Sequence, residues 1–119
     1  MTSLFHGLCL MLFLGFITGT AAAQSQHEMN AEARAAFEKA DAELNKVYKN
    51  VLATLDEEAQ AKLKVAQRAW VALRDAEAGF QADQEARGGS MEPMIYSGVA
   101  AELTRARIKE LRKMLSKPN

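Results

Sequence analysis

This sequence of 119 residues contains little cysteine or histidine and has no excess of basic charge. It contains one cysteine, Cys9, so no disulfide can form within a single chain. Its 15 basic and 15 acidic residues cancel, whereas a nucleic-acid-binding protein needs a basic excess for its phosphate contacts. The length fits one domain. We therefore expect a single domain that does not bind nucleic acid.

Residues suited to catalysis or metal binding are also scarce. Beyond residue 23 there is no cysteine, and His27 is the one remaining histidine, so neither a Ser-His-Asp set nor a His/Cys zinc site can be assembled. In a chain beginning at Gln24, His27 would be fourth, not third as an N-terminal copper site requires. Glu57 and Glu58 lie where a helix would begin, and the helix dipole favours negative side chains there. That effect explains the two glutamates better than a role in acid–base catalysis. We predict a non-enzymatic protein without a metal or cofactor.

The first 23 residues lack Asp, Glu, Lys and Arg, so every charged side chain lies after them. Leu8 to Ile17 form an apolar run, shorter than the roughly 20 residues of a membrane-spanning helix. Ala21 and Ala23 supply the small residues of a signal-peptide cleavage site. We predict that residues 1–23 are a cleaved signal peptide carrying Cys9, and that residues 24–119 form the exported domain, periplasmic or extracellular, with no membrane span. The alternative is that residues 1–23 form a buried helix.

Apolar periodicity predicts an all-α protein with three helices. The first runs from about Glu28 to Leu55, the second starts after an Asp56 N-cap and ends before Gly88-Gly89, and the third follows Pro93. The predicted buried positions recur every three or four residues. They are Phe37, Ala40, Leu44, Val47, Val51 and Leu55; Leu63, Ala66, Trp70, Leu73 and Phe80; and Ile95, Val99, Leu103, Ala106 and Leu111 or Met114.

The short connection at Asp56 predicts that the first two helices are antiparallel neighbours. The third helix would then cover the groove between them. The expected fold is a three-helix up-down bundle built on a long antiparallel helical hairpin, with Trp70 buried among Leu44, Leu73 and Leu103.

Polar residues interrupt the predicted apolar faces and call for specific partners, because Asp, Asn and Thr are mediocre helix formers. They lie one turn apart on each helix: Asp41 with Asn45, Gln67 and Trp70 with Arg74 and Asp75, and Thr104 with Arg107. We expect a hydrogen-bond network between helices in which Asp41 or Asp75 pairs with Arg74 or Arg107. A cluster that binds a small ligand and plain solvent exposure are the alternatives.

Four motifs occur in a characteristic order. They are Asp41-Ala42-Glu43-Leu44-Asn45-Lys46-Val47-Tyr48, Gln67-Arg68-Ala69-Trp70-Val71-Ala72-Leu73-Arg74-Asp75, Gly88-Gly89-Ser90 and Leu103-Thr104-Arg105-Ala106-Arg107. Together they resemble the family of small exported helical domains named after the lysozyme inhibitor LprI, over residues 28–115. Relatives often carry cysteines near Glu32, Ala78 and Val99, which this sequence lacks.

The resemblance implies an envelope protein that binds another protein, with inhibition of a lysozyme-type muramidase as its specific form. Lysozymes cut with two carboxylates in an open cleft, which a loop of small residues with hydrogen-bond donors could fill. The alternatives are a structural or accessory module of the envelope with no lysozyme contact, and a small-ligand binder using Asp41, Asn45, Arg74 and Arg107.

The segment between the second and third helices is the predicted partner-binding surface. Connecting loops lie at the surface, and Tyr, Arg and Met are enriched where proteins meet. The residues concerned are Arg87, Gly88, Gly89, Ser90, Met91, Met94 and Tyr96. The alternative surface is the basic third helix with Arg105, Arg112 and Lys113.

Overall fold

The computed structural model describes residues 18–117, which form three helices and no strand. Helix α1 spans Thr18–Ala53, α2 spans Glu57–Ala86 and α3 spans Glu92–Leu115. The prediction of an all-α up-down bundle is confirmed. The apolar run of the predicted signal peptide, with Cys9, lies outside the described residues.

Helix α1 begins at Thr18, so the predicted start near Glu28 is wrong. Ala21–Ala23 and the Ala, Gln and Glu residues that follow are good helix formers, and no proline or glycine occurs between Gly19 and Gly79. The helix therefore continues without a break across the predicted cleavage site.

Two local structures join the helices. Asp56 caps α2, since its side chain accepts a hydrogen bond of 2.8 Å from the Ala59 N–H. The Gln60 side chain donates to the Leu52 and Leu55 carbonyls at 2.8 and 3.1 Å, which ties the first turn of α2 to the end of α1 and to the turn that follows it. Gly88, at φ 68°, turns the chain out of α2 in a conformation that favours glycine. The predicted cap and glycine stop are both confirmed.

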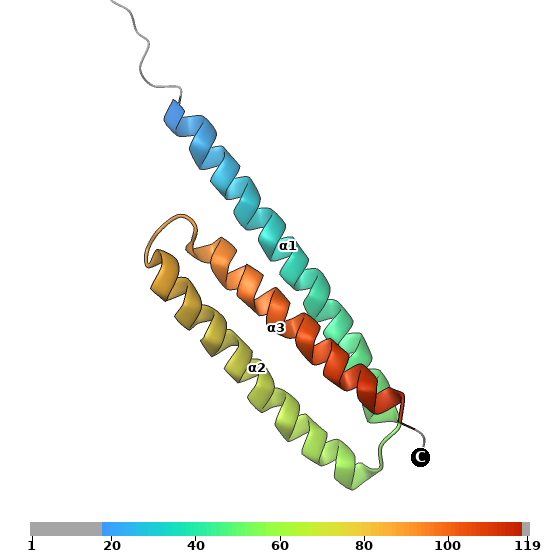
Figure 1. Cartoon of the computed structure of the whole chain (residues 1–119). Coiled ribbons are helices and arrows are strands. Elements are labelled where there is room, and N and C mark those ends of the chain that lie inside the picture. Colours follow the sequence, from blue (N-terminus) through green and yellow to red (C-terminus); the bar gives the residue numbers. More distant parts are fainter. Residues whose placement is uncertain (1–17, 118–119) are drawn as a thin grey trace, which may run out of the picture.

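The arrangement of the helices differs from a hairpin with a covering helix. Helix α3 lies between the other two and packs along both, as Figure 1 shows, while α1 and α2 barely approach each other through their backbones. The prediction that α1 and α2 form the neighbouring pair is therefore wrong. Small residues explain the central position, because Ala78 and Ala82 on α2 and Ala100 and Ala101 on α3 are buried and allow close packing.

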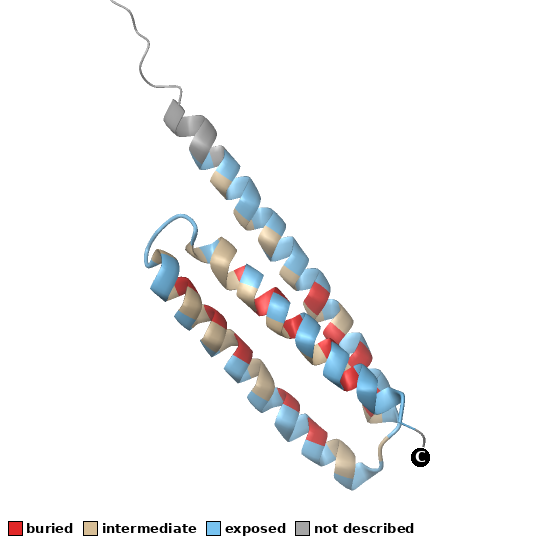
Figure 2. Ribbon diagram, in the orientation of Figure 1, coloured by how far each residue is buried: buried red, intermediate tan, exposed pale blue. Residues whose placement is uncertain are grey.

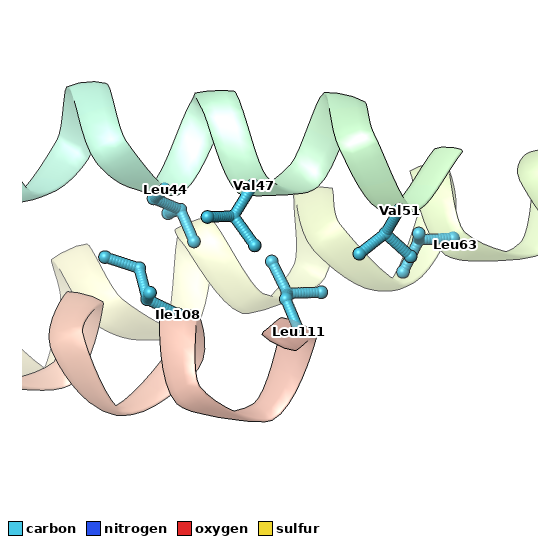
Figure 3. Packing of buried hydrophobic residues seen from close by; sticks show 6 residues of the cluster. All are labelled: Leu44, Val47, Val51, Leu63, Ile108 and Leu111. Atoms are coloured by element: carbon cyan, nitrogen blue, oxygen red, sulfur yellow. The ribbon is translucent and has the colours of Figure 1, made fainter. Parts of the chain in front are cut away.

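The aliphatic core lies near the hairpin connection of α1 and α2 (Figure 3). Its buried members are Leu44, Val47 and Val51 of α1, Leu63 of α2, and Ile108 and Leu111 of α3. Tyr48, Leu52, Leu55 and Trp70 pack against it while partly exposed. The predicted apolar face of α1 is thus confirmed, with Ala40 also buried and Phe37 and Leu55 at its margin.

The buried faces of α2 and α3 are not those the apolar pattern predicts. On α2 the buried residues are Leu63, Gln67, Arg74, Ala78 and Ala82, whereas Ala66, Leu73 and Phe80 are exposed (Figure 2). On α3 they are Ser97, Ala100, Ala101, Thr104, Ile108 and Leu111. Ile95, Val99 and Leu103 are only half-buried, and Ala106 and Met114 are exposed. Helices α2 and α3 pack closely through the faces that carry alanines, and the large apolar residues of α2 therefore stay exposed.

Candidate functional site

Arg74 of α2 is the centre of the polar network. The residue is only 6% exposed. Its Nη1 donates to Asp41 Oδ1 of α1 at 2.8 Å, and its Nε donates to Asp75 Oδ1 at 2.8 Å. Thr104 of α3 lies 3.5 Å from Nη1 and donates its own hydroxyl to the Ala100 carbonyl at 2.7 Å. One guanidinium therefore connects all three helices.

The surroundings of Arg74 hold it in the charged form. Burial by itself lowers the pKa of the guanidinium, but the hydrogen bonds and charges of Asp75 and Asp41 outweigh that effect and raise the pKa above its ordinary value. The guanidinium carbon lies 5.0 Å from the ring centre of Phe37 and 5.4 Å from that of Trp70. These aromatic faces add favourable cation–π contacts.

Arg107 of α3 makes a second set of polar contacts beside Trp70. Its Nε donates to Gln67 Oε1 at 3.0 Å, its Nη1 pairs with Glu110 at 2.8 Å, and its guanidinium carbon lies 5.9 Å from the Trp70 ring centre. Trp70 is therefore in contact with two guanidinium groups. It is half-buried, and Leu73, one of its predicted neighbours, is exposed, so the predicted packing of Trp70 is only partly right.

The structure thus brings together most of the polar positions singled out from the sequence. They are Asp41, Gln67, Trp70, Arg74, Asp75, Thr104 and Arg107. Asn45 is exposed and takes no part in the hydrogen bonds of this network, while Leu44 belongs to the core and Tyr48 packs at its edge. Within residues 18–117, every buried side-chain polar atom has a hydrogen-bond partner. A small ligand would have to break existing bonds, so the geometry favours a structural network over a ligand site.

Tyr96 lies beside this network and not on the exposed loop. It is on the second turn of α3 and is half-buried. Burial raises the pKa of its hydroxyl above 10.0, and the negative charge of Asp75 raises it further. Met94 is also half-buried, whereas the preceding residues, Arg87 to Met91, are all exposed.

The exposed loop is held in place from both sides. The Gly88 N–H donates to Glu92 Oε2 at 2.8 Å, and the Gly89 N–H donates to the Ala86 carbonyl at 2.7 Å. From α1, Asn30 Nδ2 donates to the Ser90 carbonyl at 2.9 Å. The loop therefore has a defined conformation despite its exposure.

Gln26 supports this contact, since its Nε2 donates to Asn30 Oδ1 at 2.8 Å and lies 3.9 Å from the Met94 sulfur. The sequence reasoning missed both amide residues. Their spacing of one helical turn is a signal for a shared face, but nothing in it names the loop as partner. Together with His27 and Met91 they line a shallow pocket over Gly89 and Ser90.

Arg87 does not present an unpaired charge. Its Nε and Nη2 donate to the two carboxylate oxygens of Asp83 at 2.8 and 2.6 Å, a bidentate pair. This hydrogen bond lowers the pKa of Asp83. The Nη1 group remains available to an external acceptor.

The described part of the chain has neither a candidate metal site nor a helix that could span a membrane. No cluster of three or more His, Cys, Asp or Glu side chains there could hold a metal ion. None of its helices combines the length and apolarity needed to cross a membrane.

Comparison with known proteins shows what this sequence is similar to. The model of a family described as "Lysozyme inhibitor LprI" matches residues 18–111. An uncharacterized protein of Rhizobium meliloti (strain 1021) is 46% identical in an alignment that covers 78% of this chain and 76% of that protein. No solved structure matches.

Proposed function

The chain belongs to the LprI lysozyme inhibitor family, and from this premise we propose that it is an exported, non-enzymatic inhibitor of a lysozyme-type muramidase. The observation that carries the proposal is the exposed Arg87–Met91 loop, which Asn30 fixes to α1 through the Ser90 carbonyl. A loop already held in one conformation loses little entropy when it binds, so more of its contact energy becomes affinity.

The chemistry of the loop fits the cleft of a muramidase. Such enzymes cut between two carboxyl groups in an open groove. Gly88 and Gly89 keep the tip narrow, Ser90 offers a hydroxyl, and the Nη1 of Arg87 can donate to a cleft carboxylate in a charge-assisted hydrogen bond. Met91, which is 46% exposed, supplies an adaptable apolar contact.

Export is part of the proposal. Cleavage after Ala23 would leave Gln26 and Asn30 in the mature chain, so the contacts that hold the loop would survive. N-terminal sequencing of protein collected outside the cytoplasm is expected to begin at Gln24. A product beginning at Met1 would contradict this.

The function is tested by muramidase-driven lysis of a cell-wall suspension, together with calorimetric measurement of binding to several lysozyme classes. Met91→Glu should abolish inhibition, because it places a carboxylate against the carboxylates of the cleft. Met114→Glu is the matched control, since Met114 is 43% exposed near the opposite end of α3 and should leave inhibition unchanged. Asn30→Ala should weaken inhibition by releasing the loop.

Two outcomes would contradict the proposal. Absence of inhibition of every lysozyme class at large molar excess would favour an accessory envelope module with no lysozyme contact. Full inhibition by the Met91→Glu variant, with loss on neutralising Arg105, Arg112 and Lys113, would move the binding surface to α3.

A further inference from the structure

The outer side of α2 carries a second apolar face that nothing in the described structure covers. Val65, Leu73 and Phe80 are 67%, 64% and 60% exposed, although each is a large apolar residue. With 100° between successive residues, they lie on the side of α2 away from its buried residues, such as Arg74 and Ala78. Single exposed apolar residues are common, but a continuous row along one helix marks an interaction surface.

Smaller residues complete this row. With 100° between successive residues, eight positions fall within about 70° of one line along the helix. We name these positions the outer α2 stripe: Val65, Ala66, Ala69, Ala72, Leu73, Ala76, Gly79 and Phe80. None of them is charged or polar, and the stripe is about 22 Å long at 1.5 Å per residue.

The stripe is symmetric about the midpoint between Ala72 and Leu73. In an antiparallel pair of identical helices, residues equally distant from the twofold axis face each other. An axis at that midpoint pairs Val65 with Phe80, Ala66 with Gly79, Ala69 with Ala76, and Ala72 with Leu73. Every apolar position therefore meets another apolar position, so the stripe is self-complementary.

The charges at the two ends of the stripe obey the same symmetry. Within one chain, Lys62 pairs with Glu58 at 2.8 Å and Arg87 pairs with Asp83 at 2.6 Å. The same axis places Glu58 opposite Arg87 of a second copy, and Lys62 opposite its Asp83. Each end thus brings together two positive and two negative groups in an alternating arrangement.

Gly79 supplies an independent argument. It lies inside α2, where glycine is a poor helix former, yet a Cβ added there would meet no atom within 4 Å. Its own chain therefore gives no steric reason for glycine. In the symmetric pair it lies level with Ala66 of the other copy, at the edge of the stripe, where the absence of a side chain lets two backbones approach closely.

We propose that the chain forms a twofold-symmetric homodimer through antiparallel packing of α2 on α2 along the outer α2 stripe. The two copies would place their Arg87–Met91 loops at opposite ends of the interface, because α2 runs in opposite directions in them. A dimer of this kind leaves Gly88 to Met91 exposed in both copies, while Arg87 lies at the end of the interface. The dimer does not depend on the muramidase proposal.

The first test is sedimentation equilibrium on the protein purified after expression of the full chain. The wild type is expected to be a dimer, and Leu73→Glu a monomer with unchanged helicity by circular dichroism. Met114→Glu, a comparable change outside the stripe, should remain a dimer. A wild type that stays monomeric at millimolar concentration would overturn the proposal.

Reversal of the end charges tests the register. The double variant Glu58→Lys, Lys62→Glu keeps an attractive pair within the helix but places like charges opposite each other across the dimer at both ends. The double variant Asp83→Arg, Arg87→Asp has the same two effects. Each pair of changes should raise the dimer dissociation constant about tenfold, and all four together should restore it. Failure of the four-residue variant to recover would refute this register.

Cross-linking tests the orientation. In a Cys9→Ser background, Ala72→Cys lies next to the axis and should form an intermolecular disulfide on oxidation. Ala61→Cys should not, because the two copies of residue 61 would be about 35 Å apart at 1.5 Å per residue. Equal cross-linking at both positions would overturn the antiparallel arrangement. A monomeric chain that loses muramidase binding on Leu73→Glu would instead assign the stripe to that partner and also overturn the dimer.

Discussion

Replacement of Arg74 by methionine tests whether the polar network holds the three helices together. Methionine keeps the apolar stem of the side chain and removes the guanidinium, so it isolates the charge from the packing. The change leaves Asp41 and Asp75 without their partner and removes the contacts with Phe37 and Trp70.

The size of the effect follows from exposure. Breaking a buried ion pair costs roughly 3–5 kcal/mol when the remaining charge stays buried. The side chains of Asp41 and Asp75 are 40% and 45% exposed, so water can solvate them and the cost falls to about 2 kcal/mol. Two lost cation–π contacts add about 1 kcal/mol together. A total of about 3 kcal/mol corresponds to a fall in melting temperature of about 12–24 °C for a domain of this size.

Thermal and urea denaturation followed by circular dichroism measure this loss. Arg34→Met is the matched control, because Arg34 pairs with Glu38 at 2.9 Å while both side chains are mostly exposed. Arg74→Lys should recover only part of the stability, since an ammonium cannot reproduce the planar fork that reaches both carboxylates. An Arg74→Met variant within about 1 kcal/mol of the wild type, as expected of the control, would refute the reasoning.

Three further predictions concern single residues. Trp70→Ala should lower the free energy of unfolding by about 3 kcal/mol, because a large side chain against the aliphatic core is lost, and an unchanged melting temperature would show that Trp70 does not support the core. Burial raises the pKa of Tyr96 in the folded state, so its contribution to the free energy of unfolding should be full below pH 10.0 and fall above it. This fall should disappear in Tyr96→Phe. The step of the ultraviolet tyrosine titration that occurs at the higher pH should disappear in the same variant. Asp56→Ala should cost about 1 kcal/mol through loss of the α2 cap, whereas Asp56→Asn, which keeps the acceptor, should cost little.

The candidate site was predictable in part for local reasons. The spacing of one helical turn placed Asp41, Arg74 and Thr104 on helix faces where each needed a polar partner on another helix. The partners could not be assigned from spacing, because Arg74 could have paired with either acid and in fact binds both. Gln26 and Asn30 were missed, since their target is a backbone carbonyl 60 residues away from Asn30 that only the fold brings near.

The sequence by itself determined the three helices, the Asp56 cap, the Gly88 turn and the buried face of α1. These features depend on local backbone preferences and on a face with one clear apolar row. On α2 two apolar rows compete, and only the tertiary structure decided between them. Close packing against the alanines of α3 favoured the row with Ala78 and Ala82, and it left Leu73 and Phe80 on the outside because large side chains would hold the helices apart.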